Sequence, residues 1–171
     1  LHWHCHFIQK LETEPELEFS SMHPMCDKLR GDGDNEIIEK WIKGETGFPF
    51  LDACMQFLKK KGWINFRMRA MIMSFASYNL WQPWQKTSPL LAQLFIDYEP
   101  GIHICQVQMQ SGVTGINLPR IYSVIKQSKD QDPDASWIKS QLPQLREFSA
   151  NSIHNAAVSY THLTLPTIDP V

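Results

Sequence analysis

The chain has 171 residues, of which 43% are hydrophobic, and its formal net charge is −2. This length suits about one domain with a substantial core, and so small a net charge does not favour binding of nucleic acid over the whole surface. No apolar run approaches the roughly 18 residues of a membrane span, and no secretion leader is recognisable. The four cysteines lie far apart without a CxxC pair, so we expect reduced thiols in a cytosolic or nuclear setting. Of these two settings the cytoplasmic one is favoured.

The spacing of apolar residues predicts an all-α chain. The expected helices cover 2–11, 35–43, 49–61, 64–81, 88–97 and 136–142. Asn35 is the expected N-cap of the second helix and Gly44 its end, whereas Pro49 suits the first turn of the third. The segment 136–142 is expected to be the last helix.

Two polar segments and the C-terminal end lie outside this helical pattern. Residues 13–34 and 128–136 predict loops. Residues 156–171 fit no helical pattern, and we expect a boundary after residue 155 with no structural role beyond it. Two explanations stay open: an ordinary disordered tail, or a non-biological extension, because "SYTHLTLPT" resembles a translated sequencing adapter.

Three histidines and a cysteine crowd the first residues, at His2, His4, Cys5 and His6. On a strand the three imidazoles would share one face, as a metal site needs. On a helix His4 points away from the other two, and the i, i+4 spacing of Trp3, Phe7 and Leu11 predicts a helix here. We therefore expect no metal, and exposed imidazoles are the simpler interpretation.

The middle of the chain is locally basic. No acidic residue lies between Asp52 and Asp97, whereas this stretch includes Lys59, Lys60, Lys61, Arg67, Arg69 and Lys86. Such a stretch either faces phosphate or forms the solvated end of a helix before Gly62, where lysines complement the helix dipole. The second interpretation is favoured.

Arg67 and Arg69 lie within an expected helix that is apolar nearly all the way round. Two residues apart, their side chains point roughly 200° apart, so at least one must face inward. A buried guanidinium needs an anionic partner, because an unpaired buried charge costs several kcal/mol. Asp97, at the end of the next apolar helix, is the candidate partner.

Three motifs together carry a resemblance to a known family. They are "WIKGETGFPFLDACMQFLKKKGWINFRMRAMIMSFASYNL", "LAQLFIDYEPG" and "RIYSVIKQSKDQDPD…WIKSQLPQL". Over about residues 1–154 the chain resembles the helical flavin-binding domain of photolyases and cryptochromes, in a cryptochrome-like bacterial branch. The resemblance implies a partial all-α FAD-binding domain over residues 1–155, without the N-terminal α/β antenna domain, which is where any antenna pigment would bind.

The resemblance also implies roles for particular residues. Arg69 and Asp97 would pair beside the isoalloxazine ring of FAD, Glu99 would meet its pyrimidine edge, and His103 would face flavin N5, where imidazole is a possible proton donor. The other implied positions are Trp63 and Phe66 near flavin and lesion, Trp84 in an electron relay, and Trp3, His4, Arg67 and Met109 toward damaged DNA. The resemblance also implies that Trp3 faces inward from its helix and that His4, at the position of a usual Arg, is a candidate for phosphate contact.

Several positions depart from the family pattern. Phe66 replaces a usual Asn near flavin and lesion, and Met109 replaces a Trp of the lesion pocket. Val107 replaces the flavin-proximal Trp of the relay, so photoreduction either uses another route, through Trp81 or Tyr78, or is poor.

Three functions stay open. The first is a piece of a monomeric, light-driven DNA photolyase that transfers an electron from reduced flavin to a flipped pyrimidine dimer. The second is a cryptochrome-type blue-light receptor without repair activity. The third is a helical remnant unable to bind flavin.

Overall fold

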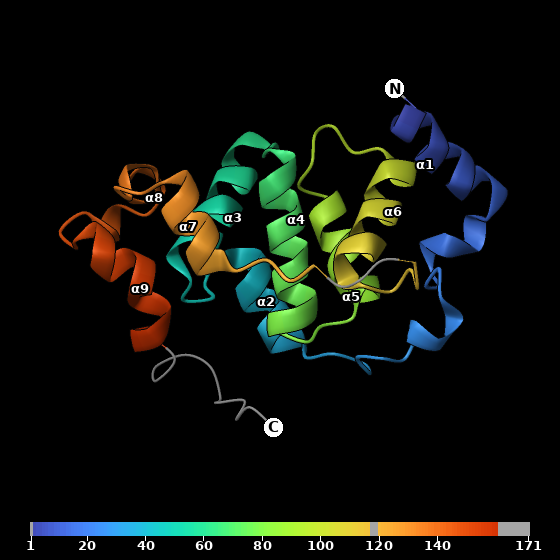
Figure 1. Cartoon of the computed structure of the whole chain (residues 1–171), viewed down its shortest axis with the longest axis horizontal. Helices are drawn as coiled ribbons and strands as arrows, with labels where there is room; N and C mark the ends of the chain where they lie inside the picture. The colour runs from blue at the N-terminus through green and yellow to red at the C-terminus, as the bar shows by residue number, and fades with distance from the viewer. Residues whose placement is uncertain (1, 117–119, 161–171) are drawn as a thin grey trace.

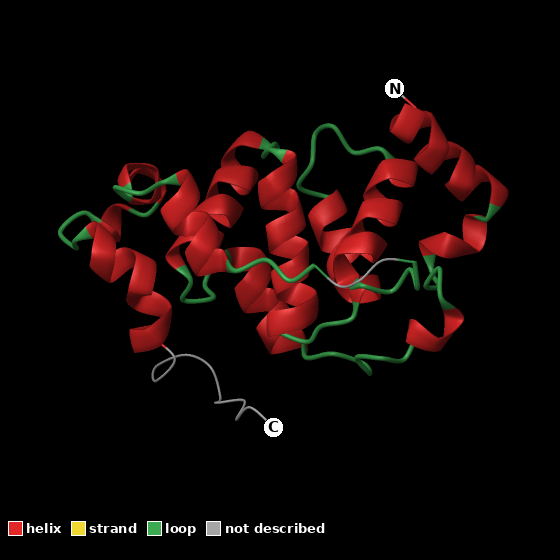
Figure 2. Ribbon diagram, viewed as in Figure 1, coloured by secondary structure: helices red, strands yellow, loops and turns green. Residues whose placement is uncertain are grey.

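The computed structural model describes residues 2–116 and 120–160, and within these residues it is built from helices without a strand (Figure 2). The expected all-α class is confirmed. The α-helices are α1 (His2–Thr13), α2 (Asn35–Lys43), α3 (Pro49–Lys61), α4 (Phe66–Ser74), α5 (Trp84–Ala92), α6 (Pro100–Ser111), α7 (Val124–Gln131), α8 (Ser136–Gln141) and α9 (Ala150–Tyr160). Short helical turns are η1 (Pro15–Glu18), η2 (Pro24–Cys26), the π-helix η3 (Phe75–Asn79) and η4 (Pro143–Leu145).

The helices are arranged along an elongated molecule, with α1 and α6 toward one end and α8 and α9 at the other (Figure 1). Helix α3 lies in the core, because one run of its residues is fully buried: Leu51, Ala53, Cys54, Met55 and Leu58. Helices α2, α4, α7, α8 and α9 all contact it. Burial of this apolar run supplies the main driving force for that half of the fold.

Helix α2 begins one residue earlier than its sequence signal suggested. The Asp34 side chain accepts hydrogen bonds from the backbone N–H groups of Glu36 (2.8 Å) and Ile37 (3.2 Å). Asp34, not Asn35, is therefore the N-cap, and the expectation for Asn35 is wrong. Both residue types can cap a helix, and only the backbone path decides which one precedes the first turn. The expected end at Gly44 is confirmed by its φ of 74°.

Asp34→Ala should lower the free energy of unfolding by about 1 kcal/mol, because two N–H groups at the start of α2 lose their acceptor. Urea denaturation followed by circular dichroism measures this change. Asn35→Ala is the matched control and should stay within about 0.5 kcal/mol of the parent. A larger loss of unfolding free energy in Asn35→Ala than in Asp34→Ala would show that Asn35 is the N-cap.

The long helix expected over 64–81 is divided in the structure. Asn65 caps α4 by accepting from the N–H of Met68 at 3.1 Å, and after Ser74 the chain widens into the π-helix η3, where Leu80 N–H donates to Phe75 O at 3.0 Å. The carbonyl of Ser77, within η3, accepts from Arg30 Nε at 2.6 Å. A π-turn needs no special residue type, so its position was not visible in the apolar spacing.

Two helices differ from the sequence prediction: the start of α5 was misplaced, and α6 was not predicted. Helix α5 begins at Trp84 rather than Ser88, and Pro89 lies inside it, since a proline in a helix removes one hydrogen bond without necessarily ending it. Helix α6 starts at Pro100 and ends at Gly112, whose φ is 68°. The surrounding glutamines and glycines concealed this helix.

The C-terminal part is also more helical than expected. Helix α7 extends into the expected loop 128–136, and α9 follows the segment that was expected to be last. Helix α9 continues to Tyr160, so the expectation of no helical pattern after residue 155 is wrong for its first five residues. The division of the chain at this point stays a prediction, and residues 161–171 lie outside the described residues.

Candidate functional site

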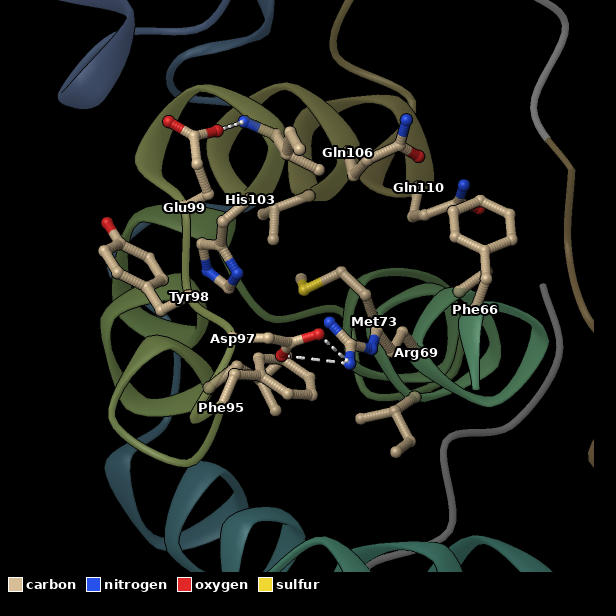
Figure 3. A pocket seen from close by; sticks show the side chains of 15 residues that line it. Phe66, Arg69, Met73, Phe95, Asp97, Tyr98, Glu99, His103, Gln106 and Gln110 are labelled. Atoms are coloured by element: carbon tan, nitrogen blue, oxygen red, sulfur yellow. Dashed lines mark hydrogen bonds and ion pairs between the residues drawn. The ribbon is translucent and has the colours of Figure 1, made fainter. Parts of the chain in front are cut away.

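The largest concentration of predicted site residues surrounds a cavity between α4, α6 and the segment that joins α5 to α6 (Figure 3). Its space, with the open mouth included, is about 780 Å³. Four of the predicted cofactor-binding residues line it together with His103, namely Phe66, Arg69, Asp97 and Glu99. These residues are up to 37 positions apart in sequence (103 minus 66), so the tertiary structure brings them together.

Arg69 and Asp97 form an ion pair at the floor of this cavity. Arg69 Nη2 lies 2.8 Å from Asp97 Oδ2 and 3.1 Å from Oδ1, and Arg69 Nε donates to the carbonyl of Ile64 at 2.8 Å. The side chains are 27% and 45% exposed. The pair is therefore half-open to whatever occupies the cavity, and its geometry agrees with the pairing expected from the sequence.

Aromatic rings hold the Arg69 guanidinium in place. Its central carbon lies 4.2 Å from the centroid of the Phe95 ring and 6.0 Å from that of Trp63. Stacking on an aromatic face favours a flat orientation of the cation. The remaining guanidinium donors are thus available to a ligand.

His103 is on α6, on the other side of the cavity. Its Nε2 lies 3.0 Å from both the carbonyl oxygen and the hydroxyl of Ser88 on α5, and its ring meets Tyr98 edge-to-face at a centroid distance of 5.3 Å. Burial lowers the pKa of His103, with a smaller lowering from the nearby Arg69 charge, against a raising hydrogen bond to Ser88. The neutral imidazole is therefore favoured in the folded protein.

The lowered pKa of His103 predicts a pH-dependent stability. In the unfolded chain the imidazole has its ordinary pKa of 6.5, so it binds a proton more readily than in the folded chain. The contribution of His103 to stability is therefore present above that value and is lost as the pH falls through the range from there to the lowered folded value. Urea denaturation should show that the free energy of unfolding falls less between pH 7.5 and pH 5 in His103→Gln than in the parent protein. An unchanged slope would contradict this assignment.

Glu99 has a structural task besides lining the cavity. It is the N-cap of α6, and its Oε2 accepts from the N–H of Ile102 at 2.7 Å (Figure 3). A carboxylate at this position complements the positive end of the helix. One of its oxygens is thus committed to the fold, which leaves the other for a ligand.

The remaining predicted residues are not part of this cavity. Trp3 is 72% exposed on α1, so the expectation that it faces inward is wrong. His4 and Arg67 are exposed as well, and Met109 is half-buried away from the cavity. The short helix expected over 2–11 is confirmed, and its outer face is free because α1 contacts the body of the molecule mainly through α6.

Two predicted tryptophans flank the cavity without lining it. Trp63 is 49% exposed and stacks distantly on Arg69. Trp84 is buried, and its indole N–H donates to the Ser21 hydroxyl at 3.0 Å. Trp84 lines a second cavity behind α5, and His103 and Tyr98 line both cavities.

Two polar residues of α6 that line the cavity were not predicted from the sequence. Gln106 and Gln110 follow His103 at helical spacing and line the same cavity (Figure 3). The buried side-chain oxygen of Gln106 has no hydrogen-bond partner among the described residues. Recognition of α6 as a helix would have revealed this polar strip.

Within the described part of the chain, no three His, Cys, Asp or Glu side chains are arranged so that they could hold a metal ion. The same residues include no helix with the length and hydropathy needed to cross a membrane.

The fold and this cavity define a helical flavin-binding domain, as a comparison with solved structures indicates. An archaeal photolyase from Sulfolobus tokodaii, solved with two FAD molecules, superposes with a TM-score of 0.85 and 25% sequence identity, over 96% of this chain and 38% of that one. A sequence profile described as the FAD binding domain of DNA photolyase matches residues 1–165. The chain therefore belongs to the photolyase/cryptochrome family.

Curated relatives come from both branches of that family. A deoxyribodipyrimidine photo-lyase of Alkalihalophilus pseudofirmus is 29% identical over 82% of this chain and 30% of its own length. Cryptochrome-1 of Macaca fascicularis is 27% identical over 90% of this chain and 26% of its own length. The chain thus spans about a third or less of these relatives.

Proposed function

We propose that this chain is the flavin-contacting part of a light-driven photolyase that repairs pyrimidine dimers in DNA. The observation that carries the proposal is the half-open Arg69–Asp97 pair in a cavity of a photolyase-family FAD-binding domain. FAD, when bound, would supply light absorption and single-electron transfer. The protein's task is then to bind the ring, orient it and keep water away from it.

The residues present fit a flat ring system with a polar edge. Apolar side chains such as Phe66, Met73 and Val107 contribute to the cavity wall. Arg69 and Asp97 offer a donor and an acceptor on one side, and the unpartnered oxygen of Gln106 awaits a donor on the other. Unpaired buried polar atoms are costly in a protein alone, so this oxygen supports a ligand that satisfies it.

The same proposal assigns the DNA contacts to residues on α1, α4 and α6. Trp3 presents an exposed indole beside Phe7, at a centroid distance of 5.8 Å, and exposed aromatic rings stack well on unpaired bases. His4 and Arg67 are exposed and suit phosphate, and Met109 would lie toward the lesion. Flipping of a damaged base would bring it against such a surface.

Trp3→Ala should weaken binding of DNA that contains a thymine dimer about tenfold, because one stacking platform is lost. Fluorescence anisotropy with a dimer-containing and an undamaged oligonucleotide measures the difference. Phe148→Ala, which removes another exposed aromatic ring at a distant site, should leave both affinities within about twofold. Equal losses for both oligonucleotides would contradict a lesion-specific role.

The main alternative is a photoreceptor of cryptochrome type without repair activity. Phe66, Val107 and Met109 support it, because they alter positions that the family uses for flavin, electron relay and lesion. Trp84 would still act as a relay member, with Trp81 or Tyr78 on another route. An antenna pigment, a cytoplasmic location and a monomeric state belong to either version.

Two measurements separate these functions. Titration with FAD should give a protein-bound flavin spectrum, in this chain or in any longer protein that contains it, and blue light should then convert thymine-dimer DNA to monomers. Flavin binding without dimer loss would favour the photoreceptor. If neither this chain nor a longer protein that contains it binds flavin, the remaining interpretation is a helical remnant unable to bind flavin.

A further inference from the structure

We propose that Ser88 is a positioning residue that fixes the tautomer of His103, so that the imidazole offers the Nδ1 lone pair to the cavity and selects a ligand ring with an N–H donor there. The ligand part of this inference rests on the proposed flavin function. The tautomer itself does not.

The contacts of His103 decide which nitrogen has the hydrogen. Nε2 lies 3.0 Å from the carbonyl oxygen of Ser88 and 3.0 Å from its hydroxyl oxygen. A carbonyl oxygen can only accept a hydrogen bond, so Nε2 must be the donor. A neutral imidazole has a single N–H, and Nδ1 is therefore a bare acceptor.

The surroundings keep this imidazole neutral. Arg69 acts on it electrostatically across the cavity, and burial disfavours the charged ring. The other titratable groups that line the same cavity are Asp97, which is committed to Arg69, Glu99, which caps α6, and Tyr98, whose ring meets His103 edge-on. The two carboxylates of this cavity thus have partners of their own, and Glu18 lines the second cavity, which His103 also lines.

The two ring nitrogens of His103 face different surroundings. Ser88 lines the second cavity, behind α5, but not the first. Since Nε2 is directed to Ser88, the opposite edge of the ring is the one turned to the first cavity (Figure 3). His103 is therefore an acceptor at this site, not the proton donor that imidazole at this position suggested.

This arrangement predicts which form of a ring ligand binds better. A ring atom with a hydrogen can donate to Nδ1, whereas a bare nitrogen or carbonyl would oppose its lone pair and remain unsatisfied. Reduced flavin has ring N–H groups that oxidised flavin lacks. The chain should therefore bind reduced FAD about fivefold more tightly than oxidised FAD.

The first test measures the tautomer directly and needs no flavin. Long-range proton–nitrogen correlation spectra of the chain with labelled histidine should show His103 protonated at Nε2 at neutral pH. His154 is the internal reference, because its Nε2 also faces a carbonyl, that of Pro133 at 3.0 Å, while Nδ1 meets the Ser128 hydroxyl at 2.7 Å. A His103 ring protonated at Nδ1, or an even mixture, would overturn the proposal.

A variant then separates the two acceptors of Ser88. Ser88→Ala removes the hydroxyl but keeps the carbonyl, so the Nε2–H tautomer should persist while its proton exchanges severalfold faster with solvent. A switch of tautomer in Ser88→Ala would overturn the part assigned to the carbonyl.

The ligand part is tested by anaerobic titration with oxidised and reduced FAD. The fivefold preference for reduced FAD should disappear in His103→Phe, which keeps a ring but has no acceptor. Equal affinity of the parent chain for both forms would overturn the selection. Absence of binding to either form would instead count against the proposed function, and the tautomer result would still stand.

Discussion

Arg69→Met should lower the affinity of the chain for FAD about thirtyfold, because charge-assisted hydrogen bonds contribute more than ordinary ones. The substitution keeps an unbranched apolar side chain and removes the guanidinium, whose central carbon lies over the Phe95 ring. Asp97, which is 45% exposed, then remains as an uncompensated negative charge beside the bound ring. Flavin fluorescence during titration provides the measurement.

The same substitution should have little effect on folding. Pairs as exposed as Arg69 and Asp97 contribute at most about 1 kcal/mol to stability, since water screens both partners. Arg146→Met, at an exposed arginine far from the cavity, is the matched control and should leave FAD affinity within about twofold. If Arg69→Met proved as tight a binder as the parent, the cavity would not be the flavin site.

Gly101→Ala should separate α1 from the rest of the molecule and lower the free energy of unfolding by about 2 kcal/mol. A Cβ at Gly101 would lie 2.7 Å from Ile8 Cα and 2.9 Å from Phe7 O. These are backbone atoms, so neither can turn aside as the end of a side chain could. Alanine normally favours a helix over glycine by about 1 kcal/mol, and here the clash outweighs that gain.

Hydrogen exchange shows which helices lose stability in Gly101→Ala. Amides of α1 should lose protection in Gly101→Ala while those of α3 keep it, because α1 contacts the body mainly through α6. Gly31→Ala is the matched control: its φ is +58° and nothing lies within 4 Å of the added Cβ. It should cost about 1 kcal/mol from backbone strain alone and leave α1 unchanged. Equal protection of α1 in both variants would show that Gly101 is not the contact that holds it.

The fold class could be predicted because helical periodicity is a local property. The apolar residues of α3 repeat at the spacing that one buried helix face requires, and Pro49 and Gly62 mark its ends. Helix α6 lacked such a signal, since its glutamines face a cavity and another buried contact instead of solvent. Gln108, for example, is fully buried and donates to the carbonyls of Leu17 and Ser20.

By itself the sequence determined that this protein is helical and that at least one of Arg67 and Arg69 needs an anionic partner, because a guanidinium in an apolar helix cannot remain inside unpaired. The tertiary structure alone decided that Trp3 lies outside, that the chain widens at Phe75, and that His103 faces Ser88. These outcomes depend on which surfaces meet across long sequence separations, and the direction of a ring nitrogen or of one exposed indole leaves no periodic trace in the chain.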